Sequence, residues 1–207
     1  MLGLLYKDIV SSKIWILFTW GIAVVFSICM VFDPIDMKSA LFFLLVLSYM
    51  AVLVRFFQSE EKNNTMVLLK TLPIPYSIIV AAKYLLCFLT VFSSLLLFFL
   101  LSLVMPGVGI NAWSGVSALF LLYLFLFGTS YSAIVIFVSL RWGSSYSNAA
   151  VIAVYFLSFA LMKYALPYFS LTQTLVNILI PLALVLISIV LFTLSVKAVK
   201  TRNYMTA

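Results

Sequence analysis

SIIVAAKYLLCFLTVFSSLLLFFLLSLVM, residues 77–105, is the stretch that decides the kind of fold this chain can adopt. Its only charged residue is Lys83, near its start. A transmembrane helix needs about 20 consecutive apolar residues to cross a hydrocarbon core roughly 30 Å thick. The stretch exceeds that length, so it predicts a membrane span whose first residues, 77–83, lie in the interface.

The whole chain has the same apolar character. Charged residues make up 8% and hydrophobic residues 66% of its 207 residues, and the mean hydropathy is +1.29. A soluble domain carries about 25% charged residues. So few charges cannot cover the surface of a soluble fold of this size, and lipid must therefore be much of its solvent.

Five further apolar runs approach the length of a span. We therefore predict an all-α integral membrane protein with six transmembrane helices in a single domain, residues 1–207. The expected spans are residues 14–32, 39–57, 77–105, 113–140, 148–166 and 175–196. A cytoplasmic loop, residues 58–76, separates the second span from the third.

Basic residues predict the orientation. The net charge is +7, but these residues lie near the ends of the spans and form no patch of the kind that binds nucleic acid. With the N-terminus inside, the cytoplasmic side holds Lys7, Lys13, Arg55, Lys62, Lys70, Lys83, Arg141, Lys197, Lys200 and Arg202. Only Lys38 and Lys163 then lie outside. The positive-inside rule therefore predicts that both termini are cytoplasmic. We expect Lys83, near a span end, to extend its ammonium group to the headgroups.

The first residues, 1–12, predict an interfacial helix. Apolar side chains spaced three and four positions apart share one face: Leu2, Leu5, Tyr6 and Ile9. Polar side chains lie away from that face: Lys7, Asp8, Ser11 and Ser12. Such a helix can lie among the headgroups. The alternative is a loose cytoplasmic N-terminus.

Several kinds of chemistry are missing from the sequence. The acidic residues lie in loops or near span ends: Asp8, Asp33, Asp36, Glu60 and Glu61. Proton-coupled transporters generally need a titratable group within the membrane. The chain has no histidine and no Walker A pattern. We therefore expect no catalytic residue, no metal site and no ATPase activity in this chain, so any energy must come from a partner.

The loop of residues 58–76 is the only long polar stretch. Thr65 is expected to cap a short helix that extends to Leu72, because Pro73 disfavours helical geometry at the residue before it. Apolar side chains cover much of that helix: Met66, Leu68, Leu69 and Leu72. An apolar helix in a solvated loop needs a partner. It either lies on the membrane surface or docks into a groove of another protein.

The residues around this helix resemble the permease subunits of ABC-2 type transporters. The resemblance rests on a glutamate after the second span, the run Asn64-Thr65 before Leu68-Leu69-Lys70-Thr71-Leu72-Pro73, and the pair Lys83-Tyr84. In motif it covers residues 60–84, and in architecture the whole chain. The family often has an arginine shortly after the Leu-Pro, where this chain has Ile74-Pro75-Tyr76.

The resemblance implies partners and contacts. Residues 1–12 would be the family's elbow helix, and the loop helix would be its coupling helix, which sits in a cleft of a cytoplasmic ABC ATPase. The implied contact residues are Glu60, Glu61, Thr65, Met66, Leu68, Leu69, Leu72 and Pro73. ATP and Mg would bind to the ATPase. A second copy or a related permease would complete the transporter in the bacterial cytoplasmic membrane. The small size resembles permeases of bacterial peptide exporters, such as the phenol-soluble modulin exporter.

We therefore expect an exporter subunit for an amphipathic or hydrophobic substrate, such as a peptide, a drug or a lipid-like molecule. Candidate pathway residues are Tyr123, Thr129, Tyr131, Asn148 and Tyr155. Helix packing is the alternative explanation for these residues, since small and aromatic side chains also serve close helix contacts. The alternative function is a membrane interaction, immunity or scaffold protein that transports nothing. Such a protein requires no helix that docks on an ATPase.

Overall fold

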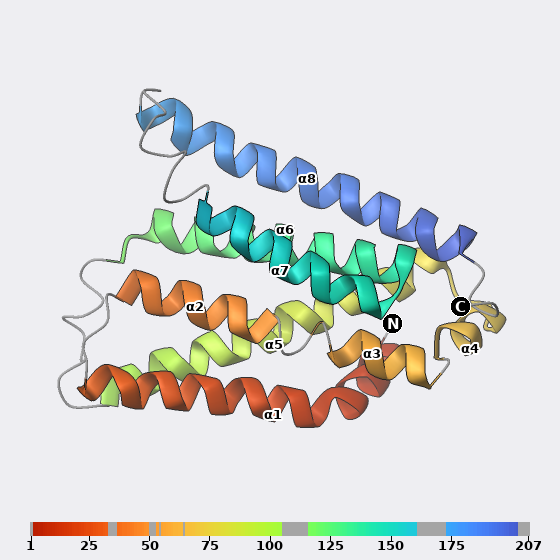
Figure 1. Cartoon of the computed structure of the whole chain (residues 1–207), viewed down its shortest axis with the longest axis horizontal. Coiled ribbons are helices and arrows are strands. Elements are labelled where there is room, and N and C mark those ends of the chain that lie inside the picture. Colours follow the sequence, from red (N-terminus) through yellow and green to blue (C-terminus); the bar gives the residue numbers. More distant parts are fainter. Residues whose placement is uncertain are drawn as a thin grey trace.

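The computed structural model describes residues 2–32, 37–49, 53, 55–63, 65–104, 116–160 and 173–202. Every regular element in these ranges is a helix, so the predicted all-α class is confirmed (Figure 1). The helices are α1 (Leu2–Phe32), α2 (Met37–Tyr49), α3 (Arg55–Lys62), α4 (Thr65–Thr71), α5 (Tyr76–Val104), α6 (Ala118–Trp142), α7 (Ser144–Ala160) and α8 (Gln173–Thr201).

Four of the described helices are long and apolar enough to cross a membrane. They are Gly3–Met30, Tyr76–Val104, Phe120–Trp142 and Ile178–Thr201. They correspond to the first, third, fourth and sixth expected spans. The second expected span, residues 39–57, falls on α2, on the start of α3 and on residues outside the described ranges. The fifth, residues 148–166, lies within the described ranges only as far as Ala160. The count of six spans therefore stays a prediction.

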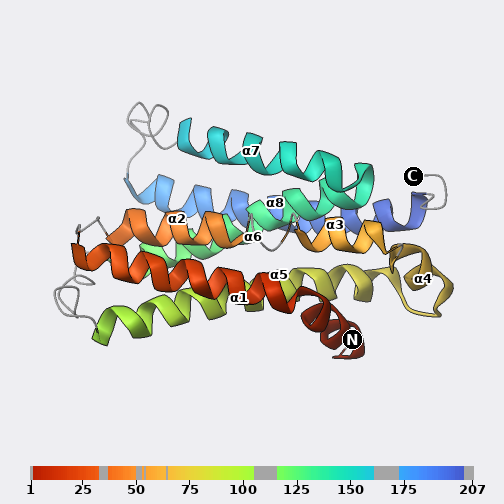
Figure 2. The same cartoon turned by 60° about the horizontal axis from the view of Figure 1, so that its bottom comes forward.

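The long helices lie side by side in a bundle with two halves. The first half consists of α1, α2 and α5, which contact one another, and the second consists of α6 with α7 and α8 on it. Helix α5 also contacts α6 and α8, so it joins the halves. Both views place the start of α1 and the end of α8 at one end of the bundle, together with α3 and α4 (Figures 1 and 2).

Apolar side chains fill the bundle and also cover its outside. Leu44, Phe98 and Ile136 are fully buried between the helices. The outer surface of α8 exposes Ile178, Leu182, Leu186, Ile189 and Val190, each by half or more. In water such a surface would be an aggregation hazard, whereas lipid chains solvate it. The bundle is therefore built for a membrane on its outside as well as for packing inside.

Helix α1 continues without a break from the expected interfacial segment into the first expected span. Its first turns bend away from the rest of the helix (Figure 2). Tyr6 and Ile9 are exposed and Leu5 is half-buried, whereas Asp8 and Ser12 are only 3% and 1% exposed. The polar face of this segment thus packs on the protein while much of its apolar face points outward. The side chain of Leu2 lies outside the described residues, and a place in the headgroup region stays a prediction.

Candidate functional site

Helix α4 lies where the sequence predicts a short loop helix. It begins at Thr65, which is its first helical residue rather than its cap, and it ends at Thr71. The backbone N–H of Ile74 then donates to the carbonyl of Leu72 at 2.7 Å, which turns the chain before Pro75. Because two prolines stiffen this connection, the end of α4 is tied closely to the start of α5.

The predicted contact residues of α4 divide into two faces. Met66 and Leu69 are 7% and 5% exposed and hold α4 to the rest of the protein. Leu68 and Leu72 are 64% and 48% exposed on the other face. Pro73 is exposed too, and Thr65 is half-buried. The exposed apolar surface at α4 is therefore made by Leu68, Leu72 and Pro73.

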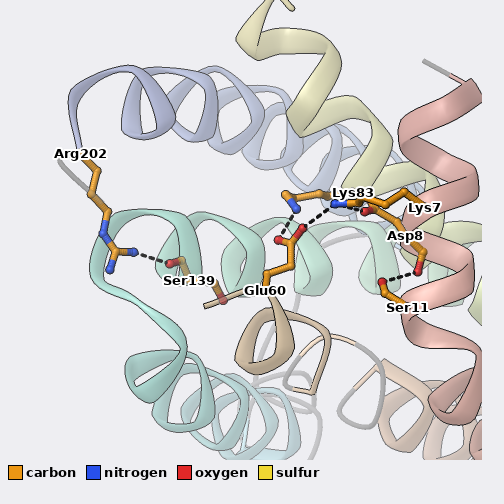
Figure 3. Close-up of polar contacts among 7 residues, drawn as sticks. All are labelled: Lys7, Asp8, Ser11, Glu60, Lys83, Ser139 and Arg202. Carbon is orange, nitrogen blue, oxygen red and sulfur yellow. Dashed lines mark hydrogen bonds and ion pairs between the residues drawn. The ribbon is translucent and has the colours of Figure 1, made fainter. Parts of the chain in front are cut away.

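Glu60 of α3 forms a buried ion-pair cluster with α1 and α5 (Figure 3). Its carboxylate pairs directly with the ammonium group of Lys83, and the two side chains are 5% and 1% exposed. Lys7 Nζ lies 3.4 Å from the other oxygen of Glu60 and 2.7 Å from Asp8 Oδ1. A buried charge is costly unless it is paired, and here two cations face two anions. The cluster therefore fixes α3 against α1 and α5.

The expectation that Lys83 reaches the headgroups is wrong. Its ammonium group lies 4.7 Å from the ring centroid of Phe56 and 5.5 Å from that of Phe57, both buried. Ring faces attract a cation, and more strongly where water is excluded. These rings and the Glu60 carboxylate together keep Lys83 inside the protein.

Glu61 belongs to a second cluster, around Arg202 at the end of α8. Arg202 Nη2 lies 3.5 Å from Glu61 Oε1. Its Nη1 donates to the carbonyls of Ser139 and Leu140 at 3.0 and 3.3 Å. A cation is favourable there, because the last carbonyls of a helix carry partial negative charge. Lys70 of α4 donates to the Arg202 carbonyl at 2.6 Å, and burial lowers the pKa of Lys70.

Gly143 makes room for this second cluster. It joins α6 to α7 with a φ of +109°, a conformation that glycine tolerates and other residues rarely adopt. A Cβ at this position would lie 2.9 Å from Glu61 Oε1 and 3.1 Å from Arg202 Nη2. The turn thus requires glycine, and a side chain at this position would displace the ion pair beside it.

Comparison with known proteins identifies the family. A family model described as ABC-2 family transporter protein matches residues 3–200. The chain belongs to this ABC-2 family. Membership makes it a multi-pass membrane protein with a permease role in an ABC transporter. Neither the comparison with curated proteins nor the comparison with solved structures finds a match.

In this ABC-2 protein the predicted pathway residues lie in different environments. Thr129 lines a cavity of about 350 Å³ between α5, α6 and α8, which Tyr84 and Ser132 also line. Tyr131 is 1% exposed and packs against Phe127, with ring centroids 6.2 Å apart. Two others, Tyr123 and Asn148, are half-buried. The side chain of Tyr155 lies outside the described residues.

Sequence reasoning on the ABC-2 chain missed the partners of both glutamates. Lys7, Lys83 and Arg202 were identified only as basic residues near span ends. A signal was present: Glu60 follows the second expected span and Lys83 opens the third, so opposite charges were already expected at the same side of the membrane. Arg202 gave no comparable signal, because it lies 141 positions from Glu61.

Proposed function

We propose that the chain is the membrane-spanning permease subunit of an ATP-driven exporter. It crosses the membrane six times with both termini in the cytoplasm, and a separate ABC ATPase binds and hydrolyses ATP. Two copies, or this chain and a related permease, form the pathway between them. Family membership and the four long apolar helices support this proposal.

The observation that carries it is the exposed apolar face of α4. Leu68 and Leu72 are exposed. Helix α4 lies at the end of the bundle where α1 begins and α8 ends (Figure 1). That end holds nine basic side chains in the described part of the chain: Lys7, Lys13, Lys62, Lys70, Lys83, Arg141, Lys197, Lys200 and Arg202. Such an excess is typical of the cytoplasmic side. A groove on a cytoplasmic ATPase would remove both leucine side chains from water.

The cavities support an amphipathic or hydrophobic substrate. One, of about 390 Å³, lies between α2, α5 and α6 and is lined by Leu41, Leu45, Phe88, Val91, Phe92, Leu95, Leu96, Phe99, Leu121, Leu124 and Phe125. The cavity beside Thr129 is lined by Tyr84, Thr129 and Ser132 together with the rings of Phe88 and Phe192. Apolar walls with a few polar groups suit a ligand that has both kinds of surface.

The test is a detergent pull-down of this chain co-expressed with the ABC ATPase encoded beside it. Leu68→Asp changes the exposed face of α4, whereas Leu69 is buried and its replacement would disturb the fold. We expect stoichiometric ATPase with the wild type and loss of most of it with Leu68→Asp. Asn63→Asp adds a carboxylate at an exposed position just before α4 and is expected to keep the ATPase.

Two outcomes would count against the proposal. Retention of the ATPase by Leu68→Asp at the wild-type ratio would show that α4 is not the docking helix. Absence of the ATPase from every sample, the wild type included, would favour a membrane scaffold that transports nothing.

A further inference from the structure

We propose that Glu60 and Glu61 make α3 a hub that fastens the docking helix α4 to both halves of the bundle, so that a displacement of α4 moves both. The proposal rests on the proposed function, since it assigns a role to α3 during ATP-driven movement. Helix α3 lies beside α4 and contacts α1 of the first half and α7 of the second. Its two adjacent glutamates carry the argument.

Glu60 forms the ion pairs that connect α3 to the first half, and we call these contacts the first arm. Its carboxylate lies between Lys83 of α5 and Lys7 of α1. Glu60 and Lys83 are only 5% and 1% exposed, so separating them would leave two buried charges that no longer pair with each other. Any shift of α3 must therefore take the start of α5 with it, or break this pair.

Glu61 forms the ion pair that connects α3 to the second half, and we call this contact the second arm. It reaches Arg202 at the end of α8, and the same guanidinium group holds the last carbonyls of α6. The Glu60 contacts and the Arg202 contacts form two separate groups in Figure 3. Successive side chains of α3 thus bind different halves of the bundle.

Helix α4 is itself attached to this second arm. Lys70 donates to the carbonyl of Arg202, so α4, α8 and the end of α6 meet at one residue. Gly143 allows this approach, because a side chain there would collide with both Glu61 and Arg202. Attachment at α3 and at α4 means that a push on α4 bears on both halves together.

The two arms differ in exposure. The Glu61 carboxylate is 43% exposed, whereas that of Glu60 is 5% exposed. Water and salt weaken an exposed pair far more than a buried one. The arm to the second half is therefore the weaker one. When Glu61 is neutralised, Arg202, which is 12% exposed, still donates to the carbonyls of Ser139 and Leu140.

The test follows the far end of the bundle in the complex of permease and ATPase in lipid nanodiscs. Spin labels are attached through Val104→Cys at the end of α5 and Ile178→Cys in α8, both exposed, in a background where Cys29 and Cys87 are replaced by serine. Pulsed electron resonance measures the distance between the labels before and after trapping with ATP and vanadate. We expect a shift in this parent protein.

Glu61→Gln is expected to reduce that shift by about half or more while the ATPase stays bound. Gly143→Ala reaches the same pair by another route and should act alike. Glu60→Gln should also reduce the shift, and Glu61→Gln keeps the test decisive if the buried variant fails to fold. Asn63→Asp, which touches neither arm, should leave the shift at the parent value.

A full shift in Glu61→Gln with the ATPase bound would overturn the hub, and so would the absence of any shift in the parent complex. Failure of the proposed function is distinguishable, because it would remove the ATPase from the sample before any distance is measured.

Discussion

The α3–α4 end of the bundle and its middle are held together by different polar contacts. At the end, carboxylates meet ammonium and guanidinium groups, and Glu60, Lys83 and Arg202 are largely buried. In the middle, hydroxyls meet: Ser48 and Ser94 lie 3.1 Å apart. Charges cost much to separate, whereas hydroxyl contacts between membrane helices contribute little. The polar contacts at the α3–α4 end are therefore stronger than those in the middle of the bundle.

Removing one charge at the α3–α4 end should have the largest effect on stability. Among the described side chains, Lys83→Met leaves the buried Glu60 with Lys7, 3.4 Å away, as its cationic partner. We expect a loss of roughly 3–5 kcal/mol in stability, because the carboxylate is no longer neutralised. Thermal unfolding of the purified protein measures this loss.

A matched double variant separates charge from packing. Lys83→Met combined with Glu60→Met removes both charges, and it should recover most of the stability lost in Lys83→Met alone. If the double variant unfolds at the same temperature as the single one, packing rather than the ion pair holds this end together.

The next largest difference in stability is expected between substitutions on the two faces of α4. Leu69→Ala empties a buried site and is expected to cost about 2–5 kcal/mol. Leu68→Ala trims an exposed side chain of the same helix and should change stability by no more than about 0.5 kcal/mol. The midpoints of thermal unfolding compare the two. Equal losses would mean that Leu68 also packs within the protein.

A small effect is also expected for a polar contact in the middle of the bundle. Ser94→Ala removes the contact with Ser48, and such interhelical hydrogen bonds in membranes average about 0.6 kcal/mol. Ser77→Ala, at an exposed position of the same helix, is the matched control. If Ser94→Ala lost as much stability as Lys83→Met, the contrast between the two regions would be wrong.

The sequence predicted local features better than long-range ones. The run ending at Pro73 predicted α4 almost to the residue, because N-terminal helix preferences and proline act on neighbouring positions. The apolar runs likewise predicted the positions of α1, α5, α6 and α8. Their lengths follow from the thickness of the bilayer rather than from their neighbours.

The contacts of the charged side chains were not predictable in the same way. Which cation meets Glu60 depends on how α1, α3 and α5 pack, and periodicity along one helix does not contain that information. The same limit explains why the pathway candidates did not gather. Tyr131 is buried in the core, while Thr129, two positions earlier and so on nearly the opposite side of α6, borders a cavity. Aromatic and small residues occur both in helix contacts and in the walls of a pathway, so composition does not separate these roles.

The inward polar face of α1 has a consequence for the order of assembly. Lys7 and Glu60 are 53 positions apart, and Lys83 comes later still. Chains are made from the N-terminus, so α1 is synthesised before Glu60 and Lys83. Asp8 and Ser12 must then stay at the watery surface, because nothing yet covers them. The opening turns of α1 therefore reach their final contacts only after α5 has been synthesised.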